Sequence, residues 1–281
     1  MLFRSCQRFP EQFDLRFEQA SSLVGLAMAL DTWFEPSLGR SEQALAVLDE
    51  ARQAYEGLVA LQPGNGDVHF QLGTIAGARM IVLQRLGRGD DALPAGREAV
   101  QRREAALALQ PDNVGYREGL AGESSNFSSH LLQMGRVDEA LAVSARGEAV
   151  IEALEREDPS VPTWAQRRRW FAMHRGRALR LAGQPHEALP RLREALLAMA
   201  DAQGGWVLGR RGWCWLERAL AEQALGEDAA ARDSAEQAVA DLRRFTAATP
   251  GDADAARRLQ QAQALLGGRS PEARCWPTRT S

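Results

Sequence analysis

The sequence has few cysteines and no long apolar run. Its three cysteines, Cys6, Cys214 and Cys275, lie far apart and form no CxxC pair. This pattern argues against a disulfide framework or a zinc site and is typical of a reducing compartment. The apolar stretch around residues 23–30 is too short to cross a bilayer, and the acidic residues before it are wrong for a signal peptide. We therefore expect a cytoplasmic protein without a membrane segment.

Motifs for catalysis, metals and nucleotides are also missing. The sequence contains no GxxxxGK[ST] loop, no GxSxG elbow, no HExxH pair and no HRD or DFG motif of a protein kinase. The four histidines show no ligand spacing. A formal net charge of −3 gives no general reason to expect nucleic acid as a partner. The sequence therefore predicts no enzyme activity, no cofactor and no metal.

What the sequence does contain is an internal repeat. A turn glycine after an apolar residue recurs five times, with spacings of 48, 48, 48 and 43 residues. These glycines are Gly39, Gly87, Gly135, Gly183 and Gly226. An alanine follows each glycine five residues later, at positions 44, 92, 140, 188 and 231. Prolines 63, 111 and 159 share the 48-residue step, and Pro250 follows after 91 residues. Periods of this size indicate stacked supersecondary units.

Each unit reads as two antiparallel helices, because the chain is rich in Ala, Leu, Glu, Gln and Arg and poor in β-branched and aromatic residues. The expected units cover about residues 11–63, 64–111, 112–159, 160–204 and 205–250, with a capping helix within 251–266. The expected helices are 11–33, 42–61, 67–86, 91–109, 113–134, 137–156, 162–182, 186–202, 206–225, 228–247 and 252–266. Pro94 and Pro190 should lie in the first turn of a helix, where a backbone N–H has no intrahelical partner. Residues 1–10 are expected to be irregular and residues 267–281 to be a disordered tail.

This combination of turn glycine, small alanine and terminal proline resembles the tetratricopeptide repeat (TPR). The common TPR has 34 residues, and two helices that are each seven residues longer would give 48. Residues 107–121, and more loosely 157–164, resemble a long variant found in bacterial proteins, often after a Ser/Thr protein kinase domain. The resemblance covers about residues 11–266. It implies an all-α, right-handed superhelical solenoid of antiparallel helix pairs with a C-terminal capping helix.

Arginines are concentrated in the expected helix 162–182, which has no acidic residue between Trp164 and Leu181. The candidate partner-binding residues are Arg168, Arg169, Arg175, Arg177 and Arg180, followed by Arg210 and Arg211 in the next repeat. One interpretation is a clamp for an acidic peptide, because guanidinium groups bind carboxylates with two hydrogen bonds. The other is an ordinary charged helix face that pairs with neighbouring residues such as Glu155, Glu157 or Glu187.

Tryptophans gather in the same two repeats, at positions 164, 170, 206, 213 and 215. Aromatic residues beside arginines are typical of interaction hot spots, but tight helix packing uses them as well. The sequence thus predicts a non-catalytic scaffold that binds a protein or peptide segment, with an acidic segment favoured and Arg169, Arg177 and Arg180 as the best candidates. The alternative is a regulatory or substrate-docking region of a bacterial Ser/Thr kinase whose catalytic domain is absent from this chain. The sequence does not identify the partner or the oligomeric state.

Overall fold

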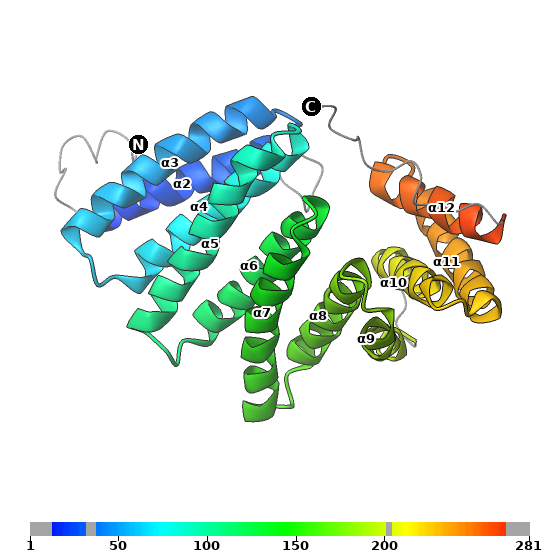
Figure 1. Ribbon diagram of the computed structural model, residues 1–281. Coiled ribbons are helices and arrows are strands. Elements are labelled where there is room, and N and C mark those ends of the chain that lie inside the picture. Colours follow the sequence, from blue (N-terminus) through cyan, green and yellow to red (C-terminus); the bar gives the residue numbers. More distant parts are fainter. Residues whose placement is uncertain (1–12, 32–37, 201–203, 268–281) are drawn as a thin grey trace. The chain divides into compact units, whose positions relative to one another are not determined.

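The computed structural model describes residues 13–31, 38–200 and 204–267 of the chain (Figure 1). These residues form helices and, within the ranges described, no strand. The helices are α2 (Phe13–Leu30), α3 (Ser41–Leu61), α4 (Gly66–Arg85), α5 (Gly89–Leu109), α6 (Val114–Gln133), α7 (Val137–Glu157), α8 (Pro162–Leu181), α9 (Pro185–Leu197), α10 (Gly205–Ala224), α11 (Asp228–Ala248) and α12 (Ala253–Leu266). The expected irregular N-terminus and most of the expected tail lie outside the described residues. None of the described helices is long and apolar enough to cross a membrane.

The repeat turns follow directly from the glycine series. The five turn glycines have φ between +64° and +74°, a region that residues with a Cβ rarely adopt. In three of the turns, the residue after the glycine donates its N–H to a leucine carbonyl one turn back, at 2.9 Å, and these leucines are Leu83, Leu131 and Leu179. The alanines five residues after the glycines are at most 8% exposed, which lets the two helices cross closely. The predicted helix pairs are therefore confirmed.

Asparagine or aspartate caps begin two of the first helices in the pairs and the capping helix. The side-chain oxygen of Asn65 accepts from Asp67 N at 3.1 Å, and that of Asn113 accepts from Tyr116 N at 3.1 Å. Asp252 accepts from Ala255 N at 2.9 Å and opens the expected capping helix α12. These caps satisfy N–H groups that have no partner within the helix.

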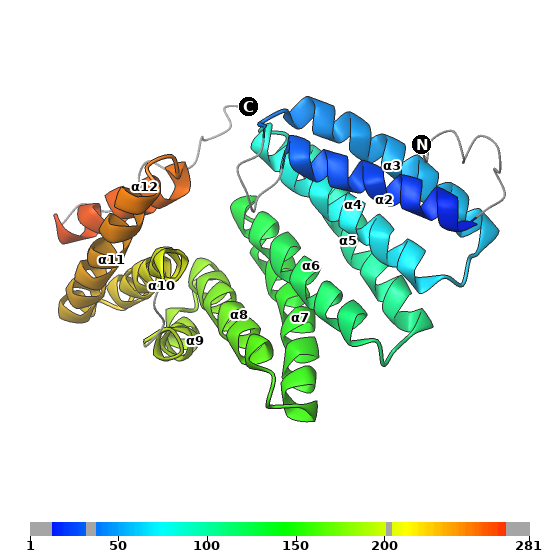
Figure 2. The same cartoon turned by 180° about the vertical axis from the view of Figure 1, so that it is seen from behind.

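The chain divides into two compact units at a repeat boundary, after Asp158. The first unit holds the pairs α2–α3, α4–α5 and α6–α7, which lie side by side in both views (Figures 1 and 2). Its core includes Leu48, Tyr55 and Leu72. The second unit holds α8–α9, α10–α11 and α12, which packs against α10 and α11 around Leu216 and Leu242. The sequence predicted five repeats without this division.

The helix α9 ends earlier than predicted. It has 13 residues and stops at Leu197, whereas the second helices of the other repeats have 21 residues and the prediction ran to 202. The connection to α10 has seven residues, against four between α7 and α8. Together these two changes account for the step of 43 instead of 48 residues between the last two turn glycines.

The two prolines lie one turn deeper than predicted. Pro94 and Pro190 are each the sixth residue of a helix, because α5 begins at Gly89 and α9 at Pro185. At this depth a proline removes a hydrogen bond to the carbonyl four residues earlier, which belongs to Asp90 in α5 and to His186 in α9. The placement in the first turn was therefore wrong, although the shared register of the two prolines is confirmed.

Candidate functional site

A pocket of about 240 Å³ lies between α8, the end of α9 and the start of α10 in the second unit. Its walls are mainly apolar, with two guanidinium groups among them. The lining residues are Pro162, Gln166, Arg169, Trp170, Met173, Ala198, Met199, Val207 and Arg210. Two of the seven predicted binding residues, Arg169 and Arg210, therefore belong to one concave site.

Local sequence explains how the pocket forms. Gln166, Trp170 and Met173 are four and three residues apart on α8, so they share one face of that helix. The early end of α9 places Ala198 and Met199 in a turn beside this face. In the other repeats, regular helix continues over the equivalent residues. The pocket thus depends on the same shortening that changes the repeat period.

The two pocket arginines are held against the wall. The guanidinium carbon of Arg210 lies 3.3 Å from the centre of the Trp170 ring, a cation–π contact. Burial lowers the pKa of Arg210 to about 9, so the side chain remains charged at neutral pH but is poorly solvated. Arg169 Nη1 donates to the carbonyl oxygen of Ala198 at 3.1 Å. A carboxylate entering the pocket would meet two cations with fixed directions.

An aromatic cluster supports the pocket from behind. The ring of His174 lies edge-on to Trp170, with centroids 4.5 Å apart, and to Trp213, with centroids 5.5 Å apart. Burial, and then the charges of Arg177, Arg210 and Arg258, lower the pKa of His174 to about 3. His174 is therefore neutral at physiological pH. Neither of its ring nitrogens has a hydrogen-bond partner among the described groups.

Two of the best sequence candidates instead form a buried ion pair. Arg180 Nε donates to Glu217 Oε2 at 2.8 Å, and Arg177 Nε lies 3.3 Å from Glu217 Oε1. The indole N–H of Trp213 donates to Glu217 Oε1 at 2.9 Å. Arg258 of α12 stacks over the Trp213 ring at 3.9 Å. These contacts hold α8, α10 and α12 together behind the pocket.

The remaining candidates lie outside the pocket. Arg168 pairs with Glu194 on α9, and Arg211 makes two hydrogen bonds to Asp241 on α11, at 2.6 and 2.8 Å. Arg175 is half-buried on α8. The carboxylates Glu194, Glu217 and Asp241 were not found by sequence reasoning, because only the packing of the helices brings them to the arginines.

The tryptophans and the cysteine have mixed roles. Trp164 and Trp213 are buried, Trp170 lines the pocket, and the side chain of Trp206 is outside the described part. Cys214 is fully buried, and burial raises the pKa of its thiol. Among the described residues, no group of His, Cys, Asp and Glu is arranged to hold a metal ion.

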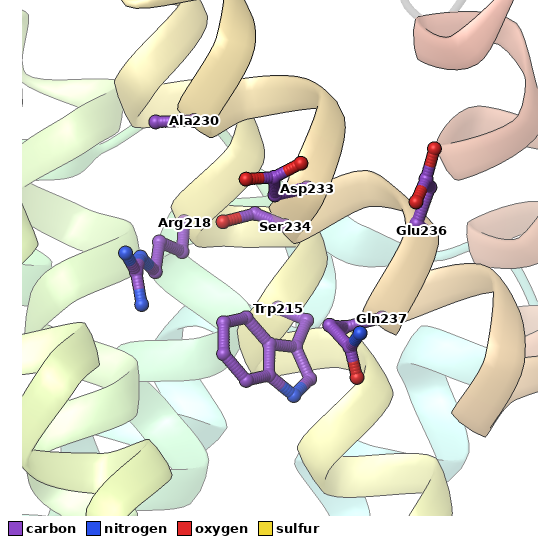
Figure 3. A pocket seen from close by; sticks show the side chains of 7 residues that line it. All are labelled: Trp215, Arg218, Ala230, Asp233, Ser234, Glu236 and Gln237. Atoms are coloured by element: carbon purple, nitrogen blue, oxygen red, sulfur yellow. The ribbon is translucent and has the colours of Figure 1, made fainter.

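A second pocket of about 360 Å³ lies between α10 and α11 (Figure 3). Trp215 and Arg218 reach it from α10, and the residues from α11 are Ala230, Asp233, Ser234, Glu236 and Gln237. Arg218 Nε and the hydroxyl of Ser234 both donate to the buried Glu222, at 2.7 and 2.6 Å. This pocket mixes both charge signs and contains none of the seven predicted arginines, so the pocket at Arg169 and Arg210 is the stronger candidate.

Comparison with solved structures supports the fold. No family model matches the sequence, and no curated protein matches it. The chain is similar to a kinesin light chain-like protein of Podosopora anserina with nearly identical TPR-like repeats, with a TM-score of 0.56 and 17% identity over 83% of this chain and 96% of that one. It is also similar to BtubC from P. vanneervenii, with a TM-score of 0.53 and 15% identity over 86% of this chain and 96% of that one. At this level of identity the likeness concerns the fold, and the chain therefore has the all-α, TPR-like repeat fold that its sequence predicted.

Proposed function

We propose that the chain is a non-catalytic scaffold that binds a protein or peptide segment, and that the pocket between α8, α9 and α10 is where the segment is anchored. An apolar side chain of the partner would enter the pocket, and a neighbouring carboxylate would meet Arg169 and Arg210. The observation that carries this proposal is the pairing of two directed guanidinium groups with an apolar wall in one concave site. Stacked helical repeats generally serve as binding surfaces, and aromatic and arginine anchors carry much of the binding energy at such surfaces.

The internal ion pairs refine the choice of contact residues. Arg177 and Arg180 neutralise Glu217, so replacing them with glutamate would put several carboxylates together in a buried place. Such variants would lose stability as well as binding. Arg169 is the better test, because its only described hydrogen bond goes to a backbone carbonyl. We therefore assign Arg168, Arg177, Arg180 and Arg211 to the support of the site, and Arg169 and Arg210 to direct contact. Arg175 lies outside the pocket and is assigned to neither group.

The test uses synthetic nine-residue peptides with a central tryptophan or leucine and acidic, neutral or basic flanks. Fluorescence anisotropy should show that the purified chain prefers the acidic set, with an affinity that falls as salt is added. Arg169→Glu should weaken binding of the acidic peptides about tenfold or more, which corresponds to about 1.4 kcal/mol.

The matched control is Arg243→Glu, which makes the same charge change at an exposed position of α11 outside the pocket. Circular dichroism checks that both variants remain helical. Equal binding of acidic and basic peptides, or equal losses in the two variants, would overturn the proposal. The widely spaced cysteines are typical of a protein in a reducing compartment, which supports a cytoplasmic location for this binding.

The kinase-docking alternative is supported by the resemblance of residues 107–121 to the long repeat variant. It predicts a kinase core encoded in frame upstream of Met1, which sequencing of the genomic DNA would show. An in-frame stop codon and a ribosome-binding site before Met1 would instead favour a free-standing adaptor.

A further inference from the structure

The third repeat, formed by α6 and α7, has an unusually polar interior. Buried polar side chains elsewhere in the first unit are few, but this pair of helices contains seven. They are Glu123, Ser124, Ser125, Ser128 and His130 on α6, and Ser144 and Glu148 on α7, all at most 6% exposed.

The repeat register shows that these polar residues replace apolar ones. Positions 123, 130 and 148 carry Glu, His and Glu, and the residues 48 positions before and after them are all apolar and buried. The earlier counterparts are Ile75, Val82 and Val100, and the later counterparts are Phe171, Ala178 and Leu196. The same backbone position therefore holds an apolar core residue in the neighbouring repeats and an ionisable one here.

The buried carboxyl of Glu123 is incompletely paired. Its Oε2 lies 3.9 Å from Arg103 Nη2, beyond hydrogen-bond distance, and its Oε1 has no partner among the described groups. Arg103 donates from Nη2 to Thr74 Oγ1 at 3.1 Å and stacks on Phe70 at 3.6 Å. Its Nε and Nη1 have no hydrogen-bond partner in the part of the chain that the structure describes. Gly77 on α4 leaves the room that this carboxyl occupies. Buried polar groups without partners destabilise the folded state.

Two more polar groups of the pair are unsatisfied. His130 Nε2 contacts the carbonyl oxygen of Gly89 at 3.2 Å, but its Nδ1 has no partner among the described groups. The hydroxyl of Ser144 is also buried without one. Among the described residues, α2 and α3 carry no unpartnered buried polar atom, whereas α4–α5 has three, all on His69 and Arg103. The third repeat differs from α4–α5 in the number of its buried polar side chains.

In a repeat array, stability is approximately the sum of terms for single repeats and for contacts between neighbours. A repeat with a polar interior at the end of a compact unit is therefore expected to be less stable locally than a repeat with an apolar interior. We propose that α6–α7 unfolds locally while α2–α5 stays folded. In the sequence, this helix pair lies between the first two repeats and the second unit, so its local unfolding would release the first two repeats from the second unit along the chain. Its weakness comes mainly from Glu123 and His130, which stand where the adjacent repeats have apolar residues.

The charge state of Glu123 makes this local opening depend on pH. Burial raises the pKa of Glu123 to about 7, and Arg103 on α5 opposes the rise only in part. From α4 the nearby groups are Thr74 and Gly77, which carry no charge. As pH rises through 7, an incompletely paired carboxylate forms in the closed repeat, so opening becomes easier.

The test is native-state hydrogen exchange of the full chain, followed by mass spectrometry and corrected for intrinsic rates at each pH. Peptides from residues 114–157 should exchange roughly tenfold or more faster than those from 66–109, because tenfold in an opening constant needs only about 1.4 kcal/mol. The variant Glu123→Ile, His130→Val, Glu148→Val copies the second repeat into the third. It should slow exchange in α6–α7 by a similar factor and leave α4–α5 unchanged.

The matched control is Ser124→Ala, which copies Ala76 of the second repeat in the same helix. It should have little effect, because the Ser124 hydroxyl is already bonded to the carbonyl oxygen of Leu120 at 2.8 Å. The reciprocal variant Val82→His should transfer fast exchange to α4–α5, and it decides the matter if the triple variant does not fold. Equal protection of the two helix pairs in the wild type, or a reciprocal variant without effect, would overturn the proposal.

Discussion

Glu123 and Glu217 are both buried carboxyls, and the hydrogen bonds around them explain why they behave in opposite ways. Burial alone would raise the pKa of Glu217, but the charges of Arg180 and Arg177 and the N–H of Trp213 hold it below its usual value. Among the described residues, Arg103 is the one charged group that acts on Glu123, at 3.9 Å, and the pKa of Glu123 rises to about 7. Glu217 therefore stabilises the second unit in its charged form, whereas Glu123 stabilises the first unit best in its neutral form.

The raised pKa of Glu123 predicts a pH dependence of stability. Because its pKa in the folded state is above the ordinary 4.5, the first unit is fully stabilised below pH 4.5 and loses stability as pH rises through 7. The loss amounts to about 3 kcal/mol at 1.36 kcal/mol for each pKa unit. Glu123→Gln should abolish it, as measured by urea denaturation at pH 5 and pH 8.

The control for this prediction is Glu152→Gln, an exposed position on α7 that loses the same charge. It should keep the wild-type difference between the two pH values. If both variants show the wild-type difference, Glu123 is not the group responsible.

At the scale of the helical element, the repeat turn depends on the left-handed glycine. Gly135 has φ of +73° between α6 and α7, where a Cβ would meet open space but the backbone would be strained. Gly135→Ala should therefore cost about 1–2 kcal/mol. Gly64→Ala is the matched control, since Gly64 also faces open space and has no positive φ. Urea unfolding followed by circular dichroism should separate the two variants, and equal midpoints would contradict the role of the turn.

The sequence predicted most helices to within two residues, because turn glycines, caps and prolines are local signals. It did not predict the end of α9, where Ala198, Met199 and Ala200 have helix-favouring side chains. The 43-residue step showed that five residues were missing but not whether the helix or the connection had lost them. The pocket depends on this detail, so its shape could not be derived from periodicity.

The candidate site was predicted only in part, because it depends on contacts between residues that are distant in the sequence. The arginine cluster on α8 is visible in the sequence, but its partners Glu194 and Glu217 lie 26 and 37 residues away from the arginines that they bind. The polar interior of the third repeat, in contrast, could have been found. Placing Glu123 and Glu148 in the 48-residue register sets them against Ile75 and Val100, a signal that needs no structure.

At the scale of the whole molecule, the division after Asp158 means that each unit has its own core. The stabilising interactions also differ. The first unit depends on apolar packing around Tyr55 and carries the poorly paired Glu123. The second unit adds an ion cluster around Glu217 that links α8 and α10, and Arg258 of α12 stacks on Trp213 beside it. A substitution in either cluster should therefore change the stability of mainly one unit.

Scanning calorimetry of the full chain should then show two transitions, and Glu217→Gln should lower only the one that belongs to the second unit. Glutamine keeps the size of the side chain but leaves Arg177 and Arg180 buried without their anion, which costs about 3–5 kcal/mol. Glu236→Gln removes a charge at an exposed position of α11 and should leave both transitions in place. A single transition that moves as a whole in the Glu217 variant would mean that the two units unfold as one, and the ion cluster would then stabilise the entire array.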